Sequence, residues 1–217
     1  MSRTSRCGTR PESRGSGSHE PGRVQRRILG RALRRRRRVW SGHPNPQLVD
    51  RVAALTPGRA LDVGCGEGAD AVWLARQGWQ VTALDVSAVG LAKAALHASD
   101  AGVDVTWRRV DLDGWSGEPG AYDLVSAQFM YLDQPALTEL FRALGASVAP
   151  GGTLLLVGHH PIDPRHGSHE FPDVRWTPED AVSWLDADDW SSIDVATIRR
   201  EGHLGTMHDG IVQATRA

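Results

Sequence analysis

From residue 39 onward, the apolar side chains follow two patterns that alternate along the chain. Short runs of consecutive apolar residues are typical of buried strands. They alternate with segments in which apolar residues recur every three or four positions, as on one face of a helix. The pattern predicts strands at 60–64, 79–84, 103–110, 121–127 and 153–157, and helices at 46–55, 69–77, 88–101 and 135–148. Strands and helices in such alternation, with short connections, form a parallel sheet wrapped by helices.

The last third of the chain has a different pattern. Residues 177–180 read Thr-Pro-Glu-Asp, a helix start that we expect to continue to about residue 185. Residues 192–199 and 210–215 alternate between apolar and polar and predict an antiparallel hairpin at the sheet edge. We therefore predict one α/β domain over residues 39–217, with a doubly wound, mostly parallel, seven-stranded Rossmann-like sheet and a C-terminal antiparallel hairpin.

Length and composition favour a globular protein with a single core. The chain has 217 residues, 24% charged and 40% hydrophobic, which leaves no room for a dinucleotide domain beside a separate substrate domain of normal size. No apolar run approaches the roughly 20 residues that cross a bilayer, so we expect no membrane partner. Cys7 and Cys65 match neither a disulfide framework nor a zinc pattern, and they favour a cytoplasmic location.

The charge is divided unevenly between the two ends of the chain. Residues 1–38 hold 13 Arg and 2 acidic residues, a net charge of +11, whereas residues 39–217 carry a net charge of −12. We expect residues 1–38 to be a disordered Arg-rich extension, because blocks of like charge rarely fold. The alternative is a nucleic-acid-binding arm. The acidic remainder argues against nucleic acid as a partner except through this segment.

A glycine-rich loop and two acidic residues carry the candidate chemistry. Residues 62–68 read Asp-Val-Gly-Cys-Gly-Glu-Gly and lie between a predicted strand and a predicted helix, where glycines let the backbone approach a ligand closely. Asp85 ends the next predicted strand, where a carboxylate can accept both ribose hydroxyls. Asp111 ends the third, where its carboxylate and the Leu112 amide can contact an adenine edge. This set suits a ligand with an amino group, a ribose and a base; helix capping is the plainer role for Asp85.

These residues resemble motifs of the class I S-adenosylmethionine-dependent methyltransferases, and the resemblance covers about residues 40–217. The loop, Asp85, Asp111 and the turn at 150–153 (Pro-Gly-Gly-Thr) occur in the order of that family's motifs. Residues 40–45 and 68–75 resemble more narrowly a small bacterial branch related to tellurite- and thiopurine-resistance methyltransferases.

The resemblance implies S-adenosyl-L-methionine as the cofactor. It implies that the loop backbone holds the methionine portion, Asp85 the ribose, and Asp111 with Leu112 the adenine. Gln128 would lie near the methionyl end or the acceptor, and Trp40 and Asn45 would close over the cofactor. The cofactor-binding residues expected on this basis are Trp40, Asn45, Asp62, Gly64, Cys65, Gly66, Gly68, Asp85, Val86, Asp111, Leu112 and Gln128.

The alternative cofactor is a nicotinamide dinucleotide in an NAD(P)-dependent oxidoreductase. Gly64, Gly66 and Ala69 satisfy the glycine fingerprint of dinucleotide-binding loops in its Gly/Ala form. Against this hypothesis stand Asp62, which would repel a pyrophosphate, and the absence of room for a second domain.

Methyl transfer from a sulfonium is an in-line displacement, in which the protein aligns the nucleophile and excludes water. A general base is needed only where the acceptor must lose a proton. His159 and His160, after the strand at 153–157, and Tyr131, after the strand at 121–127, are the candidates for a base or an acceptor-orienting group. The plainer role of the histidines is to anchor a loop. We expect a small-molecule methyl acceptor, no metal site, and a monomer or weak dimer.

Overall fold

The computed structural model describes residues 42–162, 175–202 and 205–217. In chain order its elements are α2 (Pro46–Val52), β1 (Arg59–Val63), α3 (Ala69–Arg76), β2 (Gln80–Asp85), α4 (Ala88–Ala101), β3 (Thr106–Arg109), β4 (Tyr122–Gln128), α5 (Gln134–Ser147), β5 (Val148–His159), α6 (Pro178–Ser183), the short 3-10 helix η1 (Ala187–Asp189), β6 (Trp190–Gly202) and β7 (Gly205–Arg216). Several helices begin at a side-chain cap, because the first N–H groups of a helix have no partner within it. Asn45 caps α2, Ser87 caps α4, and Thr177 with Asp180 forms a capping box at α6.

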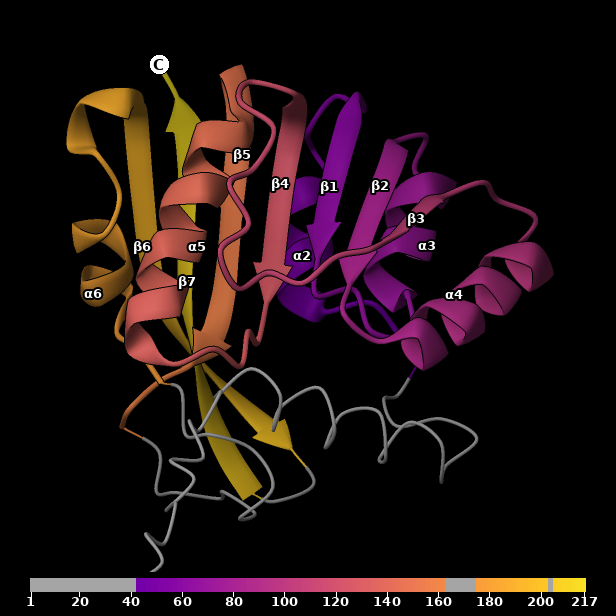
Figure 1. Ribbon diagram of the computed structural model, residues 1–217. Coiled ribbons are helices and arrows are strands. Elements are labelled where there is room, and N and C mark those ends of the chain that lie inside the picture. The colour runs from indigo at the N-terminus through magenta and orange to yellow at the C-terminus, as the bar shows by residue number, and fades with distance from the viewer. Residues whose placement is uncertain (1–41, 163–174, 203–204) are drawn as a thin grey trace, which may run out of the picture.

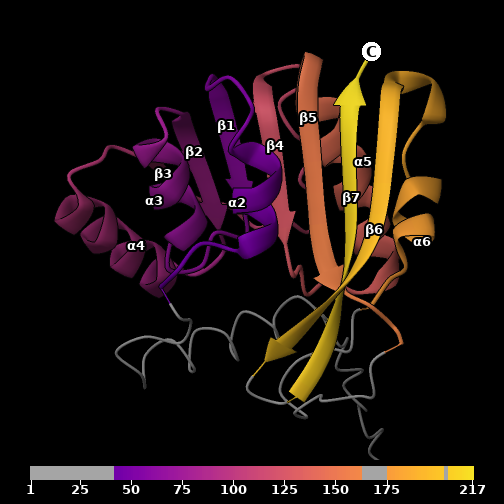
Figure 2. The same cartoon turned by 180° about the vertical axis from the view of Figure 1, so that it is seen from behind.

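Seven strands form one sheet in the order β3-β2-β1-β4-β5-β7-β6 (Figures 1 and 2). The strands β3, β2, β1, β4 and β5 run parallel, and β7 is antiparallel to both β5 and β6. The chain reaches the sheet edge at β3 and then returns to the other side of β1 as β4. In open α/β sheets, such a reversal opens a crevice at the carboxyl ends of the strands, and ligands bind there.

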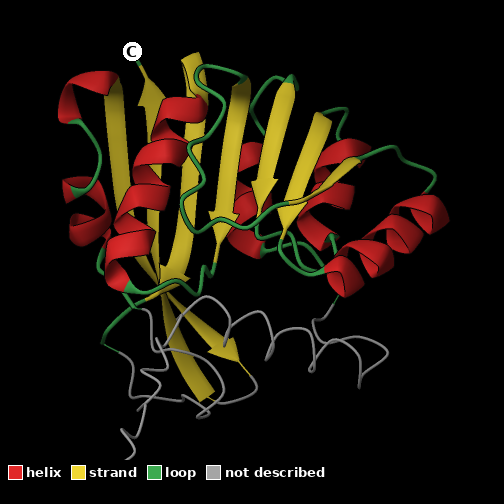
Figure 3. Cartoon of the chain, viewed as in Figure 1, coloured by secondary structure: helices red, strands yellow, loops and turns green. Residues whose placement is uncertain are grey.

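Each central strand buries side chains on both faces of the sheet. Leu61 and Val125 pack toward α5 and α6, while their neighbours Ala60 and Leu124 pack toward α2 and α3. Figure 3 shows helices on both sides of the sheet. Because both faces are covered, these strands read as continuous apolar runs without polar alternation. The alternation of faces also decides which strand-end side chains meet on the same side of the sheet.

The C-terminal hairpin is longer than the rest of the sheet. His159, the last residue of β5, pairs with Asp209 of β7. The β6–β7 ladder continues beyond this level from the Arg199–His208 pair to the Gly202–Gly205 pair. The hairpin therefore projects past the carboxyl ends of the parallel strands (Figure 1).

The structure confirms the predicted fold class, including the seven-stranded mixed sheet and the antiparallel C-terminal strands. The helix predicted at 46–55 ends at Val52, and the larger differences from the prediction lie in the strands. The strand predicted at 103–110 is limited to Thr106–Arg109, so Asp111 lies beyond its end rather than directly after it. Because the Pro-Gly-Gly segment forms an irregular start of β5 rather than a separate turn, that strand begins at Val148. The hairpin strands extend beyond 192–199 and 210–215.

The extension predicted at 1–38 lies outside the described residues, and the domain predicted at 39–217 starts just before them. Among the residues that the structure does describe, no helix has the length and apolar character needed to cross a membrane.

Gly158 of β5 gives a test of packing against the α6 side of the sheet. A Cβ at this position would lie 2.5 Å from Cε2 of Trp176, whose side chain is only 2% exposed. We expect Gly158→Ala to lower the free energy of unfolding by about 1–3 kcal/mol, as overpacking in a core does. Denaturant titration measures the change.

The matched control is Gly210→Ala, because Gly210 pairs with Gly158 across the β5–β7 ladder. A Cβ there would lie 3.4 Å from its nearest neighbour, Cδ of Pro178. We expect a change below about 1 kcal/mol, the usual range for a Gly-to-Ala change without strain. Equal destabilisation by both substitutions would contradict the packing argument.

Candidate functional site

The glycine loop between β1 and α3 has a backbone conformation that requires glycine. Gly64, Gly66 and Gly68 have φ angles of +73°, +53° and +78°, in the left-handed region that other residues rarely adopt. A Cβ on Gly64 would also lie 2.8 Å from Sδ of Met130, and one on Gly68 would lie 2.7 Å from the Trp107 ring. The loop is therefore close-packed from both sides, and its backbone lies at the carboxyl end of β1.

Asp85, at the end of β2, holds this loop in place. One carboxylate oxygen accepts a hydrogen bond from the Gly66 amide at 2.8 Å, and the other accepts one from the Ser87 amide at 2.7 Å. The amides of Gly64 and Cys65 donate to the Leu84 carbonyl at 2.8 and 3.0 Å. Burial raises the pKa of Asp85, and the two backbone donors partly offset this. Asp85 thus joins the loop to Ser87, the residue that caps α4. A residue that only capped the helix would not contact the loop.

Two further carboxylates lie close to the loop. Asp62 of β1 is 2% exposed, and burial, with Asp70 and Asp85 nearby, raises its pKa well above the usual range. Asp70, in the first turn of α3, accepts a hydrogen bond from the Asn45 amide at 2.7 Å, and burial raises its pKa to about 6. Three acidic side chains thus share one end of the site, and each is held where its negative charge is unfavourable.

Two buried acceptor atoms at this end have no hydrogen-bond partner among the described residues. They are Oδ2 of Asp62 and Oε1 of Gln128. The Gln128 amide nitrogen donates to the Ser126 hydroxyl at 3.1 Å, and Ser126 pairs with Asp62 in the β1–β4 ladder. A buried acceptor without a donor costs on the order of 1–3 kcal/mol, so both atoms are suited to a ligand that brings N–H groups.

Strand register places polar residues near the strand ends in a staggered row across one face of the sheet, in which Gln128 pairs with Val157, two residues before His159. Asp85, Asp62, Gln128, His159 and Asp209 stand on β2, β1, β4, β5 and β7, and each shares the face that packs toward α2 and α3. The row is acidic at β2 and β1, and it carries amide and imidazole groups at β4 and β5. Sequence position alone does not show this order, because it depends on the pairing of strands.

Phe129 leaves the alternation of β4. Its φ is +50°, the only positive value outside glycine in the described residues. Val125 and Ala127 face the α5 side, whereas Phe129 packs with the α2 and α3 cluster, and its ring centroid lies 4.5 Å from that of His159. Such local strain is often kept where it orients a functional side chain.

The predicted catalytic candidates fall into two groups. Tyr131 lies near Arg200, and burial raises the pKa of its phenol while the guanidinium opposes this rise. His159 packs against Phe129 beside the row. His160 is engaged differently: its Nδ1 accepts a hydrogen bond from the Ile162 amide at 3.1 Å, and its own amide donates to the His208 carbonyl. His160 thus makes two hydrogen bonds within its loop region, while Tyr131 and His159 lie next to the candidate site.

The remaining predicted residues surround the glycine loop or lie apart from it. Cys65 is within the loop, and burial with nearby Asp62 and Asp85 raises its thiol pKa. The Val86 carbonyl accepts from Arg109 at 3.1 Å. Asp111 is exposed beyond β3, and Leu112 is buried in the core. Trp40 lies outside the described residues.

Sequence reasoning missed four contributors to the site. These are Asp70, Met130, Phe129 and the hairpin pair of Arg200 and Asp209. Only Asp70 had a signal in the sequence, because it lies two residues after Gly68, in the first turn of the predicted helix that follows the loop. Within the described residues, no group of three or more His, Cys, Asp or Glu is placed to hold a metal ion.

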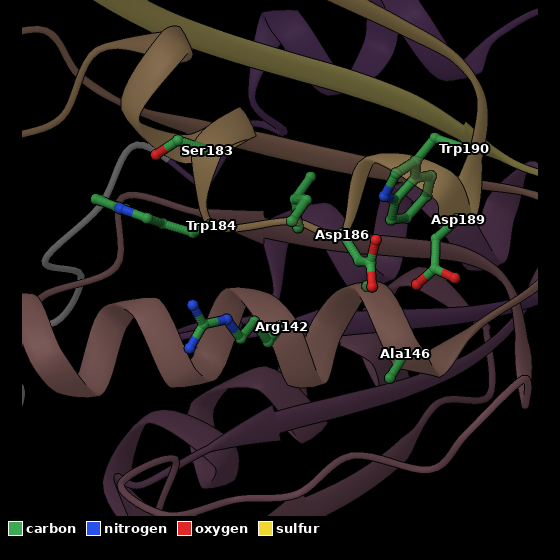
Figure 4. A pocket seen from close by; sticks show the side chains of 9 residues that line it. Arg142, Ala146, Ser183, Trp184, Asp186, Asp189 and Trp190 are labelled. Carbon is green, nitrogen blue, oxygen red and sulfur yellow. The ribbon is translucent and has the colours of Figure 1, made fainter.

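A separate cavity of about 370 Å³ lies between α5 and the α6–η1 segment (Figure 4). Arg142, Trp184, Asp186 and Trp190 line it, and none of the predicted site residues does. It is distinct from the carboxyl edge of the sheet, where the polar row and the glycine loop meet.

Comparison with known proteins agrees with this geometry. Residues 60–152 match the methyltransferase domain family, a segment that includes the glycine loop, Asp85 and Gln128. This segment is therefore similar to a methyltransferase domain, which agrees with the resemblance to the class I S-adenosylmethionine-dependent methyltransferases. A ubiquinone biosynthesis O-methyltransferase of Xanthomonas campestris pv. campestris is 38% identical over 116 residues, which are 52% of this chain and 48% of the relative. The chain thus spans about half the length of the curated relatives it matches.

Solved structures show the same fold. TehB from Haemophilus influenzae superposes with a TM-score of 0.69 at 18% identity, over 80% of this chain and 62% of that one. Magnesium protoporphyrin IX methyltransferase from Synechocystis, with bound SAM, superposes with a TM-score of 0.59 at 18% identity, over 91% and 81% of the two chains. At this identity, the likeness to TehB shows the fold alone. The matched methyltransferase family supports S-adenosylmethionine over a nicotinamide dinucleotide as the expected cofactor.

The raised pKa values of Asp62 and Asp70 predict how stability depends on pH. Both carboxyls bind protons more readily in the folded chain than in the unfolded one, so their contribution is complete below about pH 4 and is lost as the pH rises through the folded pKa values. We expect the free energy of unfolding of the ligand-free protein to fall between about pH 4 and pH 7. Denaturant titrations across this range measure the slope.

In Asp70→Asn, the loss of unfolding free energy between pH 4 and pH 7 should be smaller by on the order of 1 kcal/mol. The asparagine side chain still accepts a hydrogen bond from the Asn45 amide but does not titrate. Asp104→Asn, at an exposed position, is the control and should leave the slope as it is. If the pH dependence of stability is unchanged in the Asp70 variant, Asp70 is not one of the groups that cause it.

Proposed function

We propose that this protein transfers a methyl group from S-adenosylmethionine to a small-molecule acceptor by in-line displacement. The observation that carries the proposal is the cluster of acids around the glycine loop, with unpartnered acceptors on Asp62 and Gln128. A ligand that brings ammonium and sulfonium charge relieves the repulsion among these carboxylates and supplies the missing N–H donors. The matched family segment contains the same residues.

The loop residues have binding roles in this proposal. Gly64, Gly66 and Gly68 let the backbone approach the methionine portion, and Asp62 and Gln128 accept from its amino group. Asp85 keeps acceptor capacity for the ribose hydroxyls, because each carboxylate oxygen has a second lone pair beyond its backbone donor. Asp111 and the Leu112 amide would contact the adenine at the outer end. Asn45 links α2 to this end through Asp70.

When bound, S-adenosylmethionine supplies an activated methyl group on sulfur, and the bond to sulfur breaks as the acceptor forms its own. The side chains at β4 and β5 then align the acceptor and exclude water. His159 and Tyr131 lie next to this space. The His159 imidazole can take the proton of an acceptor that must lose one, whereas the protonated phenol of Tyr131 can donate a hydrogen bond that orients the acceptor. An acceptor that is already ionised needs no base, so only orientation is required of them.

The cofactor assignment is tested by calorimetric titration of S-adenosylhomocysteine into the full chain. We expect Asp85→Asn to weaken binding about 10–100-fold. Hydrogen bonds to a charged group contribute about 1.5–3 kcal/mol, and the asparagine side chain has one acceptor oxygen where the carboxylate has two. NAD⁺ should give no heat. Binding of NAD⁺ with none of S-adenosylhomocysteine would overturn the proposal.

A second pair of variants tests the adenine end. Asp111→Ala should weaken S-adenosylhomocysteine about fivefold to tenfold, the value of roughly one hydrogen bond. Asp113→Ala, two residues further along an exposed turn, should not change the affinity. The reverse result would move the adenine contact to Asp113.

A further inference from the structure

The C-terminal hairpin carries a buried charge pair into the candidate site. Nε of Arg200 donates to Oδ2 of Asp209 at 2.6 Å, and the Asp209 side chain is only 2% exposed. Arg200 and Asp209 lie on the same face of the ribbon, because Asp209 pairs with Ile198 and Arg200 lies two residues beyond. This is the face of the polar row, so the pair extends that row beyond β5.

Three residues after β4 connect this pair to the glycine loop. The Arg200 guanidinium lies 5.7 Å from the centre of the Phe129 ring, within the range of a cation–π contact. The next residue, Met130, reaches Gly64, where its sulfur would contact any added Cβ at 2.8 Å. Tyr131 then lies close enough to Arg200 for the guanidinium to oppose the rise in the phenol pKa that burial causes. Arg200 therefore stands one short loop away from the backbone that holds the methionine portion of the cofactor.

Arg200 keeps binding capacity after pairing with Asp209. Only its Nε has a hydrogen bond with the described residues, and its side chain is 32% exposed. The two terminal amino groups of a guanidinium present parallel N–H donors that match a planar oxyanion such as a carboxylate. Asp209 and the Phe129 ring hold the guanidinium fixed, so that little freedom is lost when it binds a second anion.

The two ends of the row differ in charge. The β2 and β1 end holds Asp85 and Asp62 and suits a cation, whereas at the hairpin end Arg200 and His159 both contact the Phe129 ring. The acids on this part of the hairpin, Asp209 and Glu201, are both paired with arginines of the same hairpin. The hairpin end is therefore the part of the row that favours a negatively charged group.

From this arrangement we propose that Arg200 binds a carboxylate or similar oxyanion on the methyl acceptor, with Asp209 and Phe129 as its positioning residues. The inference rests on the proposed methyltransferase function and names the acceptor's chemical class. The anionic group anchors the acceptor at the hairpin, and its nucleophile then points along the row toward the cofactor end. Arg200 contacts the acceptor and takes no proton from it.

The test uses the full chain with saturating S-adenosylhomocysteine, and benzoate and benzamide as probes. These two molecules have nearly the same shape and differ in charge. Saturation-transfer NMR titrations should show benzoate binding at least fivefold more tightly than benzamide. Arg200→Lys keeps the charge opposite Asp209 but loses the planar fork, and it should weaken benzoate at least fivefold while leaving benzamide unchanged.

Two further variants separate binding from folding. Arg199→Gln is the matched control, because Arg199 is exposed, pairs with Glu201 at 2.7 Å and alternates to the other face of the ribbon. It should leave benzoate binding as it is. Arg200→Met combined with Asp209→Asn removes both charges together, so no buried charge is left unpaired, and it should abolish the preference for benzoate.

Absence of benzoate binding, equal affinity for the two probes, or unchanged benzoate affinity in Arg200→Lys would each overturn the proposal. S-adenosylhomocysteine calorimetry on the same samples reports the cofactor site separately. If S-adenosylhomocysteine fails to bind, the methyltransferase proposal fails, and the benzoate titration of the ligand-free chain still decides whether Arg200 binds anions.

Discussion

The site depends on one carboxylate that holds a loop with left-handed glycines. The bonds from Gly66 and Ser87 to Asp85, together with those from Gly64 and Cys65 to the Leu84 carbonyl, keep three residues with positive φ in one arrangement. The position of Asp85 is set in turn by the β1–β2 ladder, which brings the end of β2 level with the loop. The parallel sheet thus fixes the loop, and the loop fixes where a ligand can approach the backbone.

Burial of the acidic side chains near the loop determines which ligand charge they favour. An acid at the protein surface attracts any cation weakly, because water screens it. Asp62 and Asp70 are desolvated, and their raised pKa values measure how unfavourable their charge is without a partner. A ligand with fixed positive charge removes that penalty, whereas a pyrophosphate increases it. The choice between the two cofactors that the glycine loop allows is therefore made by its acidic surroundings.

Local sequence signals predicted the position of the glycine loop and of Asp85 at a strand end, whereas they gave no sign of the contacts at the hairpin end. Glycine spacing, Asp85 and the order of strands are short-range features, and the structure agrees with them. Asp111 was assigned to a strand end, but β3 is short and stops at Arg109. The positive φ of Phe129 and the pairing of Arg200 with Asp209 depend on hairpin register and on packing between distant strands. Neither leaves a pattern in the sequence that periodicity can detect.

The segment that matches the methyltransferase family contains only one of these two ends. The matched segment stops at residue 152, so it contains the glycine loop, Asp85 and Gln128 but none of His159, Arg200 and Asp209. The hairpin pairs with β5 and does not pair with β1 or β2, so a change in its side chains need not disturb the β1–β2 ladder or the loop. If the proposed function holds, the acceptor is therefore selected by residues outside the matched segment, and a relative's acceptor carries over only if its hairpin presents a similar charge at this level of the sheet.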